Sequence, residues 1–317
     1  MDSARFTRSV FRREMVWRDL SWRKRSSLIL ASCFALSSFA FAQTAAATES
    51  PERLVRAAVA NEVAAAKNST VKHMFRSRRQ TAKGSQTRLY VETNEAMAAM
   101  LVAVDDHPLT AEQRQSEDGH LSWLMNNPDQ LRKKQAREKE DADRTLRIVR
   151  ALPDAFVYQY DGTAPGTQAM GSPGSQLVRL KFTPNRNYNP PSRVEEVLSG
   201  MDGYLLIDLR AKRLAKIDGT LYRDINFGWG LVGRLDKGGH FVVQQADLGD
   251  GSWDITDMHL DIKGKILLVK SISMVSDETF SDFRRMPDNL PFAKGVEMLK
   301  AEIHHDHITE AVKTPHP

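Results

Sequence analysis

Residues 200–219 read GMDGYLLIDLRAKRLAKIDG, and this stretch decides the fold class. Xaa-Gly pairs near its two ends return at intervals further along the chain, and such pairs mark hairpin turns because glycine adopts a positive φ at little cost. The pairs stand at 202–203, 218–219, 237–238, 250–251 and 263–264. We therefore expect short strands joined by turns at these pairs, in an antiparallel sheet that curls towards a barrel.

The residues before this stretch predict one helix and more strands. Ser50, Pro51 and Glu52 form a good helix start, because serine caps, proline fits the first turn and an acidic side chain favours the positive end. A helix is therefore expected over 51–67. The expected strands are 70–81, 86–93, 97–104, 156–160 and 176–182, with a Gly/Pro/Ser-rich loop over 162–175 and a short helix ending at Gly200.

A highly charged region over 110–151 is expected to be helical. Thr110 and Gln113 have the spacing of a capping box, and the Asn-Asn-Pro sequence at 126–128 predicts a break. Residues 131–150 contain eight basic and four acidic side chains. A solvated helix face is one interpretation of this charge run, and a site for anionic lipid headgroups is the other.

The first 42 residues have the order of a secretory signal peptide. The basic residues Arg23, Lys24 and Arg25 precede an uncharged run over 26–42, which ends in Ala-Phe-Ala, the small-x-small pattern of a cleavage site. An uncleaved anchor and lipidation of Cys33 are alternatives, and Met15 is a second candidate start. Cleavage after residue 42 leaves a linker over 43–50 and a periplasmic or extracellular protein with no transmembrane segment.

Charge and cysteine content exclude several classes for the mature chain. The net charge of +5 resides in residues 1–42, and the remainder has 37 basic and 37 acidic side chains, which argues against nucleic acid as the main partner. Cys33 is the chain's one cysteine. The mature protein is thus expected to have no disulfide, thiolate metal site or cysteine nucleophile.

A longer pattern carries a family resemblance. The Asp-Gly stretch at 200–219 is followed by Phe-Gly-Trp-Gly at 227–230, Lys-Gly-Gly-x-Phe at 237–241 and Gly-Ser-Trp at 251–253, and upstream stand Leu-Pro-Asp-Ala-Phe at 152–156 and Phe-Thr-Pro-Asn at 182–185. This order resembles exported proteins of the outer-membrane lipoprotein-sorting type, the LolA/LolB-like superfamily that includes the RseB/MucB sensor domains.

The resemblance implies an α+β fold, a strongly curved antiparallel sheet forming a half-open barrel with helices covering the concave side. It spans one domain over 51–300 with the helical insertion at 110–151 and a tail over 301–317. The implied function is non-covalent binding of a lipid, an acyl chain or a lipoprotein in the cell envelope. An open curved sheet leaves an apolar hollow, so apolar strand residues are candidate ligand contacts, with ordinary core packing as the alternative. These candidates are Phe227, Trp229, Leu231, Phe241, Val243, Trp253, Ile255 and Met258.

The sequence predicts no catalytic residue, no cofactor and no metal site. His304 and His307 are spaced to chelate a metal on a helix, but they lie near the chain end, where a fixed cage is not expected. The G-x-G-x-x-G match at 228–233 stands between strand-like segments, whereas a dinucleotide site needs a helix after it. A periplasmic sensor or scaffold that binds an envelope protein partner is the second hypothesis, and a metal-assisted hydrolase using the C-terminal histidines is the third.

Overall fold

The computed structural model describes residues 49–68, 70–227, 233–266 and 270–313, without the side chains of Ile266 and residues 305–313. The predicted signal peptide and most of the linker lie outside these residues. The helices are α1 (Pro51–Asn68), α2 (Ala111–Asn126), α3 (Pro128–Ala155), α4 (Arg193–Glu196), the 3₁₀ turn η1 (Val197–Gly200) and α5 (Phe292–Lys313). In these ranges no helix is long and apolar enough to span a bilayer.

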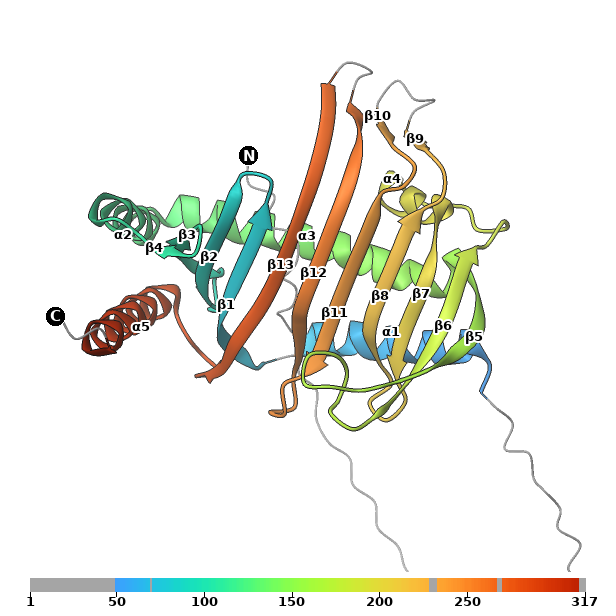
Figure 1. Cartoon of the computed structure of the whole chain (residues 1–317), viewed down its shortest axis with the longest axis horizontal. Coiled ribbons are helices and arrows are strands. Elements are labelled where there is room, and N and C mark those ends of the chain that lie inside the picture. Colours follow the sequence, from blue (N-terminus) through green and yellow to red (C-terminus); the bar gives the residue numbers. More distant parts are fainter. Residues whose placement is uncertain (1–48, 69, 228–232, 267–269, 314–317) are drawn as a thin grey trace, which may run out of the picture.

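The strands build one large antiparallel sheet. They are β1 (Lys72–Thr81), β2 (Gly84–Val91), β3 (Ala98–Val104), β4 (His107–Pro108), β5 (Phe156–Pro165), β6 (Gln176–Pro184), β7 (Met201–Asp208), β8 (Arg213–Leu221), β9 (Ile225–Phe227), β10 (Gly233–Leu235), β11 (His240–Asp247), β12 (Trp253–Ile266) and β13 (Lys270–Met286). Their order is β4-β3-β2-β1-β13-β12-β11-β8-β7-β6-β5, with β10 pairing β12 and β9. The sheet curves without closing (Figure 1), which confirms the predicted half-open barrel.

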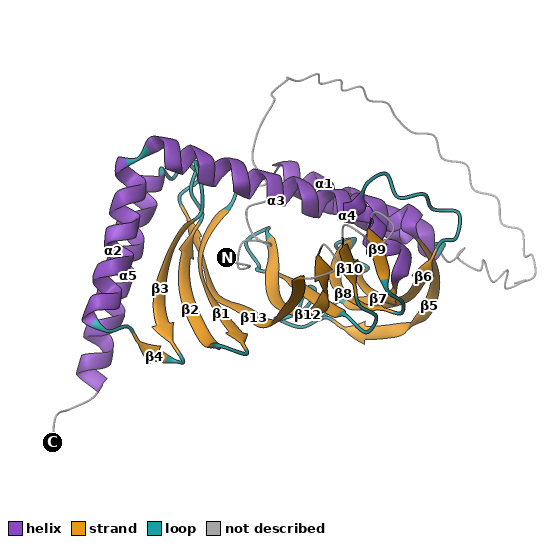
Figure 2. Ribbon diagram, turned by 90° about the horizontal axis from the view of Figure 1, so that it is seen from above, coloured by secondary structure: helices purple, strands orange, loops and turns teal. Residues whose placement is uncertain are grey.

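Helices cover the concave side of this sheet. Seen from above, α1 and α3 run along one side of the curve, and α2 and α5 stand beside each other at the end formed by β3 and β4 (Figure 2). The predicted capping box is present: Thr110 Oγ1 accepts from the Gln113 backbone N–H, and the Gln113 side chain accepts from the Thr110 backbone N–H. Pro128 begins α3, so the predicted break between two charged helices is also confirmed.

Two large hydrophobic cores contain most of the buried apolar side chains of the described residues. The larger joins α1 and the C-terminal half of α3 to the inner face of β5–β8, with Leu54, Leu152 and Leu205 among its buried members. The second joins α5 and α2 to β1–β3, with Leu121, Leu89 and Leu299 among its members. Neighbouring strand residues alternate between faces, so Met74 and Leu89 meet α5 on one face while Phe75 and Tyr90 point to the other.

Three predicted turns are wrong, because the glycines at 203, 219 and 264 lie inside strands β7, β8 and β12. Gly203 and Gly219 face each other across the β7–β8 pair. A Cβ added to Gly203 would lie 1.9 Å from the carbonyl oxygen of Asp218, and one added to Gly264 would lie 2.1 Å from that of Arg234. Glycine here permits close approach of two backbones rather than a reversal of the chain.

Some of the other expected turns and element boundaries agree with the structure, and some are shifted. The turns predicted at 237–238 and 250–251 lie between strands. Strand β5 continues to Pro165, into the segment expected to be a loop, because its residues pair with β6 across a register shift after Tyr160. Residue 300, where we placed the domain end, lies inside α5, and Ile303 beyond it packs against the second core.

Candidate functional site

Among the residues that the structure describes, the side chains that we predicted to contact a ligand do not gather around one hollow. Phe227 and Phe241 are partly buried and pack against the larger core. Phe227 also lines an open apolar cavity of about 360 Å³ between β9, β10, β12, β13 and α4. Trp229 and Leu231 lie outside the described residues.

The remaining predicted contacts are distributed over β11 and β12. Trp253 packs against a separate small cluster around Leu206. Val243, Ile255 and Met258 are half-buried, and Met258 stands directly opposite Glu278 in the β12–β13 pair. The ligand-binding role of all eight residues therefore stays a prediction.

Helix α1 is fixed into the concave side where these residues were expected to form a hollow. The Glu62 carboxylate accepts hydrogen bonds from Arg213 Nε at 2.7 Å and Nη2 at 2.8 Å, both on β8. It also accepts from the backbone N–H of Leu214 at 2.9 Å and from Gln245 Nε2 at 2.9 Å. This half of the curved sheet is filled by the chain's own helix.

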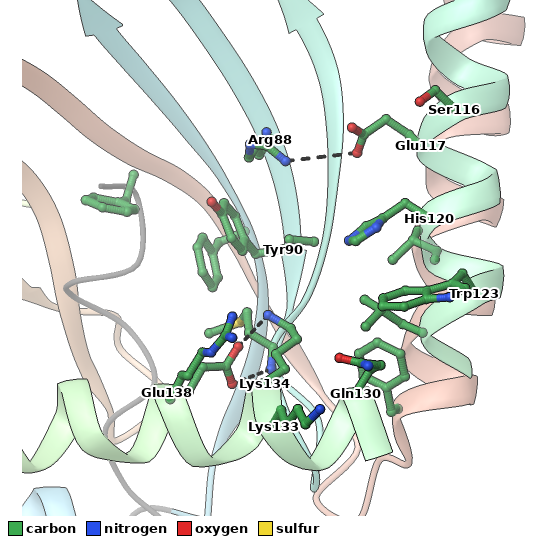
Figure 3. A pocket seen from close by; sticks show the side chains of 18 of the residues that line it. Arg88, Tyr90, Ser116, Glu117, His120, Trp123, Gln130, Lys133, Lys134 and Glu138 are labelled. Atoms are coloured by element: carbon green, nitrogen blue, oxygen red, sulfur yellow. Dashed lines mark hydrogen bonds and ion pairs between the residues drawn. The ribbon is translucent and has the colours of Figure 1, made fainter. Parts of the chain in front are cut away.

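A larger cavity, of about 520 Å³, lies at the other half of the sheet (Figure 3). Strands β1, β2, β3 and β13 form its floor, and helices α2 and α3 form its walls. The floor includes Phe75, Tyr90, Ala99 and Phe280, the α2 wall includes Ser116, Glu117, His120 and Trp123, and the α3 wall includes Gln130, Lys133, Lys134, Arg137 and Glu138. The volume is within the range of about 300–1,000 Å³ that is usual for small-molecule sites.

Aromatic rings make up much of the floor. Phe75 is fully buried and stacks on Tyr90, with ring centroids 5.1 Å apart. Phe280 and Phe283 of β13 lie 6.3 Å and 5.7 Å from Phe75. A register shift between β1 and β13, where Asp282 has a φ of 57°, lets both Phe280 and Phe283 reach the same ring.

Charged residues connect the helical walls to the edge of the sheet. Glu138 pairs with Lys134 at 2.5 Å and accepts from the backbone N–H of Met97 at 3.0 Å. Glu117 accepts from the backbone N–H of Leu101 at 3.0 Å and lies 4.0 Å from Arg88. These contacts hold α2 and α3 against β2 and β3, so the cavity is a built part of the fold.

The buried His73 has a serine and a carboxylate beside it, which are the residue types of a catalytic triad. His73 Nε2 lies 2.9 Å from Asp250 and 3.4 Å from Ser252 Oγ, and the Ser252 hydroxyl donates to Asp250 at 2.5 Å. A Ser-His-acid triad needs the serine and a hydrogen-bonded acid on opposite ring nitrogens, whereas Ser252 and Asp250 share Nε2. The other ring nitrogen, Nδ1, lies 3.8 Å from Glu92 and 3.9 Å from Asp254, beyond hydrogen-bond distance. Burial raises the pKa of Asp250, but hydrogen bonds from Ser252 and His73 outweigh it and hold that pKa below its usual range.

The C-terminal histidines give no metal site that can be described. His304 is exposed on α5, and the side chains of His305 and His307 lie outside the described residues. Within the described part of the chain, no group of three or more His, Cys, Asp and Glu side chains could hold a metal ion. The hydrolase hypothesis gains no support from these residues.

Comparison with known proteins adds little to this description. No family model matches the chain, and no curated protein matches it. Among solved structures, a crystal structure of a domain described as an outer membrane lipoprotein-sorting protein from Vibrio parahaemolyticus is similar, with 11% identity, 77% of this chain and 97% of that chain covered, and a TM-score of 0.28.

The sequence held part of the signal for the cavity. On β1, His73 and Phe75 lie on the face opposite Met74, as the two-residue period of a strand requires. A site for anionic lipid headgroups is one interpretation of the charge run at 131–150, and the first half of α3 lines the cavity. What the residues could not indicate is that α1 occupies one half of the hollow and leaves the other half open.

Proposed function

We propose that this chain is an exported, non-enzymatic binding protein for a hydrophobic ligand, and that the ligand occupies the cavity between β1–β3, β13, α2 and α3. The observation that carries the proposal is the aromatic floor of Phe75, Tyr90 and Phe280 beneath a space of about 520 Å³. The resemblance of its sequence to envelope lipid-binding proteins supports the same class of ligand. The predicted signal peptide supports export to the periplasm or the exterior.

The energetics suit an acyl chain. Each buried methylene contributes about 0.8 kcal/mol, so about ten methylenes contribute about 8 kcal/mol. This gain exceeds the lower estimates of the cost of association, about 4 kcal/mol, without any catalytic group or covalent bond. A carrier can bind and release such a ligand by partitioning alone.

Intrinsic fluorescence offers a direct assay. Trp123 lines the cavity and is 46% exposed, so a bound chain should shift its emission to shorter wavelength. Titration with lauroyl lysophosphatidylcholine below its micellar concentration should give a saturable shift, and Trp123→Phe should abolish the shift. Native mass spectrometry of protein from envelope fractions should show co-purified lipid.

Two variants that fill the cavity test the location. Ala99→Trp on β3 and Ser116→Trp on α2 place an indole into the space from opposite sides, and each should weaken binding by about 10-fold or more because the chain loses its volume. Ala136→Trp, on the exposed surface of α3, is the matched control and should bind normally. Folded Ala99→Trp and Ser116→Trp proteins that both bind like the wild type would refute the cavity as the site.

A second candidate function, a scaffold that binds an envelope protein, has one observation in its favour. Strand β5 is an end of the open sheet and exposes Val157 and Tyr160 on its length, with exposed fractions of 48% and 44%. An exposed edge can accept a further strand from a partner. Crosslinking in intact envelopes should give one defined protein adduct from β5 if this function is correct.

A further inference from the structure

The α3 wall carries two cations that the fold itself does not use. Lys133 and Arg137 are four positions apart, so they lie on the same face of the helix, and both line the cavity. In the described part of the chain neither has a carboxylate at ion-pair distance. Both side chains are exposed to solvent, so a negative group of a ligand could reach them and form charge-assisted hydrogen bonds.

The acidic residues of α3 are already engaged with other cations. Glu138 pairs with Lys134, Asp143 with Lys139, and Glu140 and Asp141 both with Arg144. The pairs of Lys139 and Arg144 lie outside the cavity lining. The α3 wall therefore presents a positive surplus towards the space.

The acidic residues of the other walls do not cancel this surplus. Glu117 is held by the Leu101 backbone N–H and lies near Arg88, and Glu278 is buried and accepts from the Ser77 hydroxyl. Each of these carboxylates has a structural contact on a strand, away from α3. The polar end of a ligand is thus attracted to the α3 wall rather than to the floor.

We infer that the cavity takes anionic amphiphiles, with the negative headgroup bound by Lys133 and Arg137 and the apolar chain lying on the aromatic floor. The inference rests on the proposed function and adds the class of headgroup to it. The Arg137 guanidinium offers a planar fork of donors to a phosphate or carboxylate, and the Lys133 ammonium adds a point charge. Gln130, one turn before Lys134, adds an amide on the same wall.

The test compares two lipids that share a chain and differ in charge. Lauroyl lysophosphatidylglycerol is anionic and lauroyl lysophosphatidylcholine is zwitterionic, and each is titrated against the mature protein below its micellar concentration. We expect the anionic lipid to bind about 10-fold more tightly at low salt, and the preference to shrink as ionic strength rises. Inorganic phosphate should compete only weakly, because it lacks the chain.

Variants assign the preference to the two side chains. The double variant Lys133→Gln, Arg137→Gln should bind the two lipids with nearly equal affinity, because the larger loss falls on lysophosphatidylglycerol, whose headgroup has no cation of its own. The matched control Arg132→Gln, Lys139→Gln removes two exposed cations of the same helix that do not line the cavity, and it should keep the preference.

Each contrary result overturns a distinct statement. Equal affinity of the wild type for the two lipids would refute the headgroup inference and leave the proposed function standing. No binding of either lipid would refute the proposed function. Phosphate that competes as strongly as the anionic lipid would show a free-anion site, and loss of preference in the control would show a diffuse field rather than this pair.

Discussion

Replacing Glu62 by alanine tests whether α1 is a permanent part of the core or a plug that can leave the concave side. The Glu62 and Arg213 side chains are only 13% and 15% exposed, and Glu62 accepts four hydrogen bonds at 2.7 to 2.9 Å. Breaking a buried pair costs about 3–5 kcal/mol, and the residual exposure lowers our expectation to about 3 kcal/mol. For a chain of this size that corresponds to a fall in the melting temperature of about 6–12 °C.

Urea unfolding followed by far-ultraviolet circular dichroism measures this loss. The matched control is Asp154→Ala, which breaks the other pair between α1 and its neighbours, that of Arg56 and Asp154, with exposed fractions of 58% and 60%. Exposed pairs contribute about 1 kcal/mol or less, so the control should remain near the wild type. If Glu62→Ala were as stable as Asp154→Ala, α1 would be a loosely held plug, and the filled half of the sheet would become a candidate hollow again.

Three further substitutions test other parts of the structure. Gly119→Ala, at an exposed position inside α2 with open space around the new Cβ, should stabilise the protein by about 0.5–1 kcal/mol in the same urea assay, and a loss of stability would contradict the described helix. Gly203→Ala should destabilise it by about 1–3 kcal/mol, because the new Cβ would overlap the Asp218 carbonyl oxygen, and a neutral result would argue against the β7–β8 register. Burial raises the pKa of Asp208, but hydrogen bonds from Ser175, Ala211 and Ser172 outweigh it and hold that pKa below its usual range. The ionised Asp208 carboxylate therefore stabilises the folded state above about pH 4, and this stabilisation is lost as the pH falls through the folded pKa. Asp208→Asn should therefore flatten the dependence of unfolding free energy on pH below about pH 4, and an unchanged slope would count against this reading.

Local chemistry explains which parts of the fold could be predicted. The Thr110 capping box and Pro128 at a helix start are signals contained within a few residues, and both lie where the sequence places them. Alternation over β1 likewise predicts which side of the strand Phe75 occupies. The curved open sheet follows from many such strands in succession.

The wrong turn predictions and the missed cavity have a different origin, because they depend on segments that are distant in the sequence. An Asp-Gly pair is compatible with a turn and with a close contact between strands, and only the partner backbone decides, as Gly203 and Gly219 show by facing each other. The candidate site depends still more on distant segments, because Phe75, Trp123 and Lys133 come from a strand and two helices. Apolar periodicity cannot distinguish Phe241, which packs against the larger core, from Tyr90, which lines the cavity.

The pairing of β1 with β13 determines when this part of the sheet can form during biogenesis. Ser77 and Glu278 meet across this pair although they lie 201 positions apart in the chain. Contacts between such distant segments form late, since a long loop must close before they stabilise anything. During synthesis β1 to β4 can pair with one another early, but the outer edge of β1 has no partner until β13, near the end of the polypeptide, has been made. That edge is the part that a chaperone would have to shield.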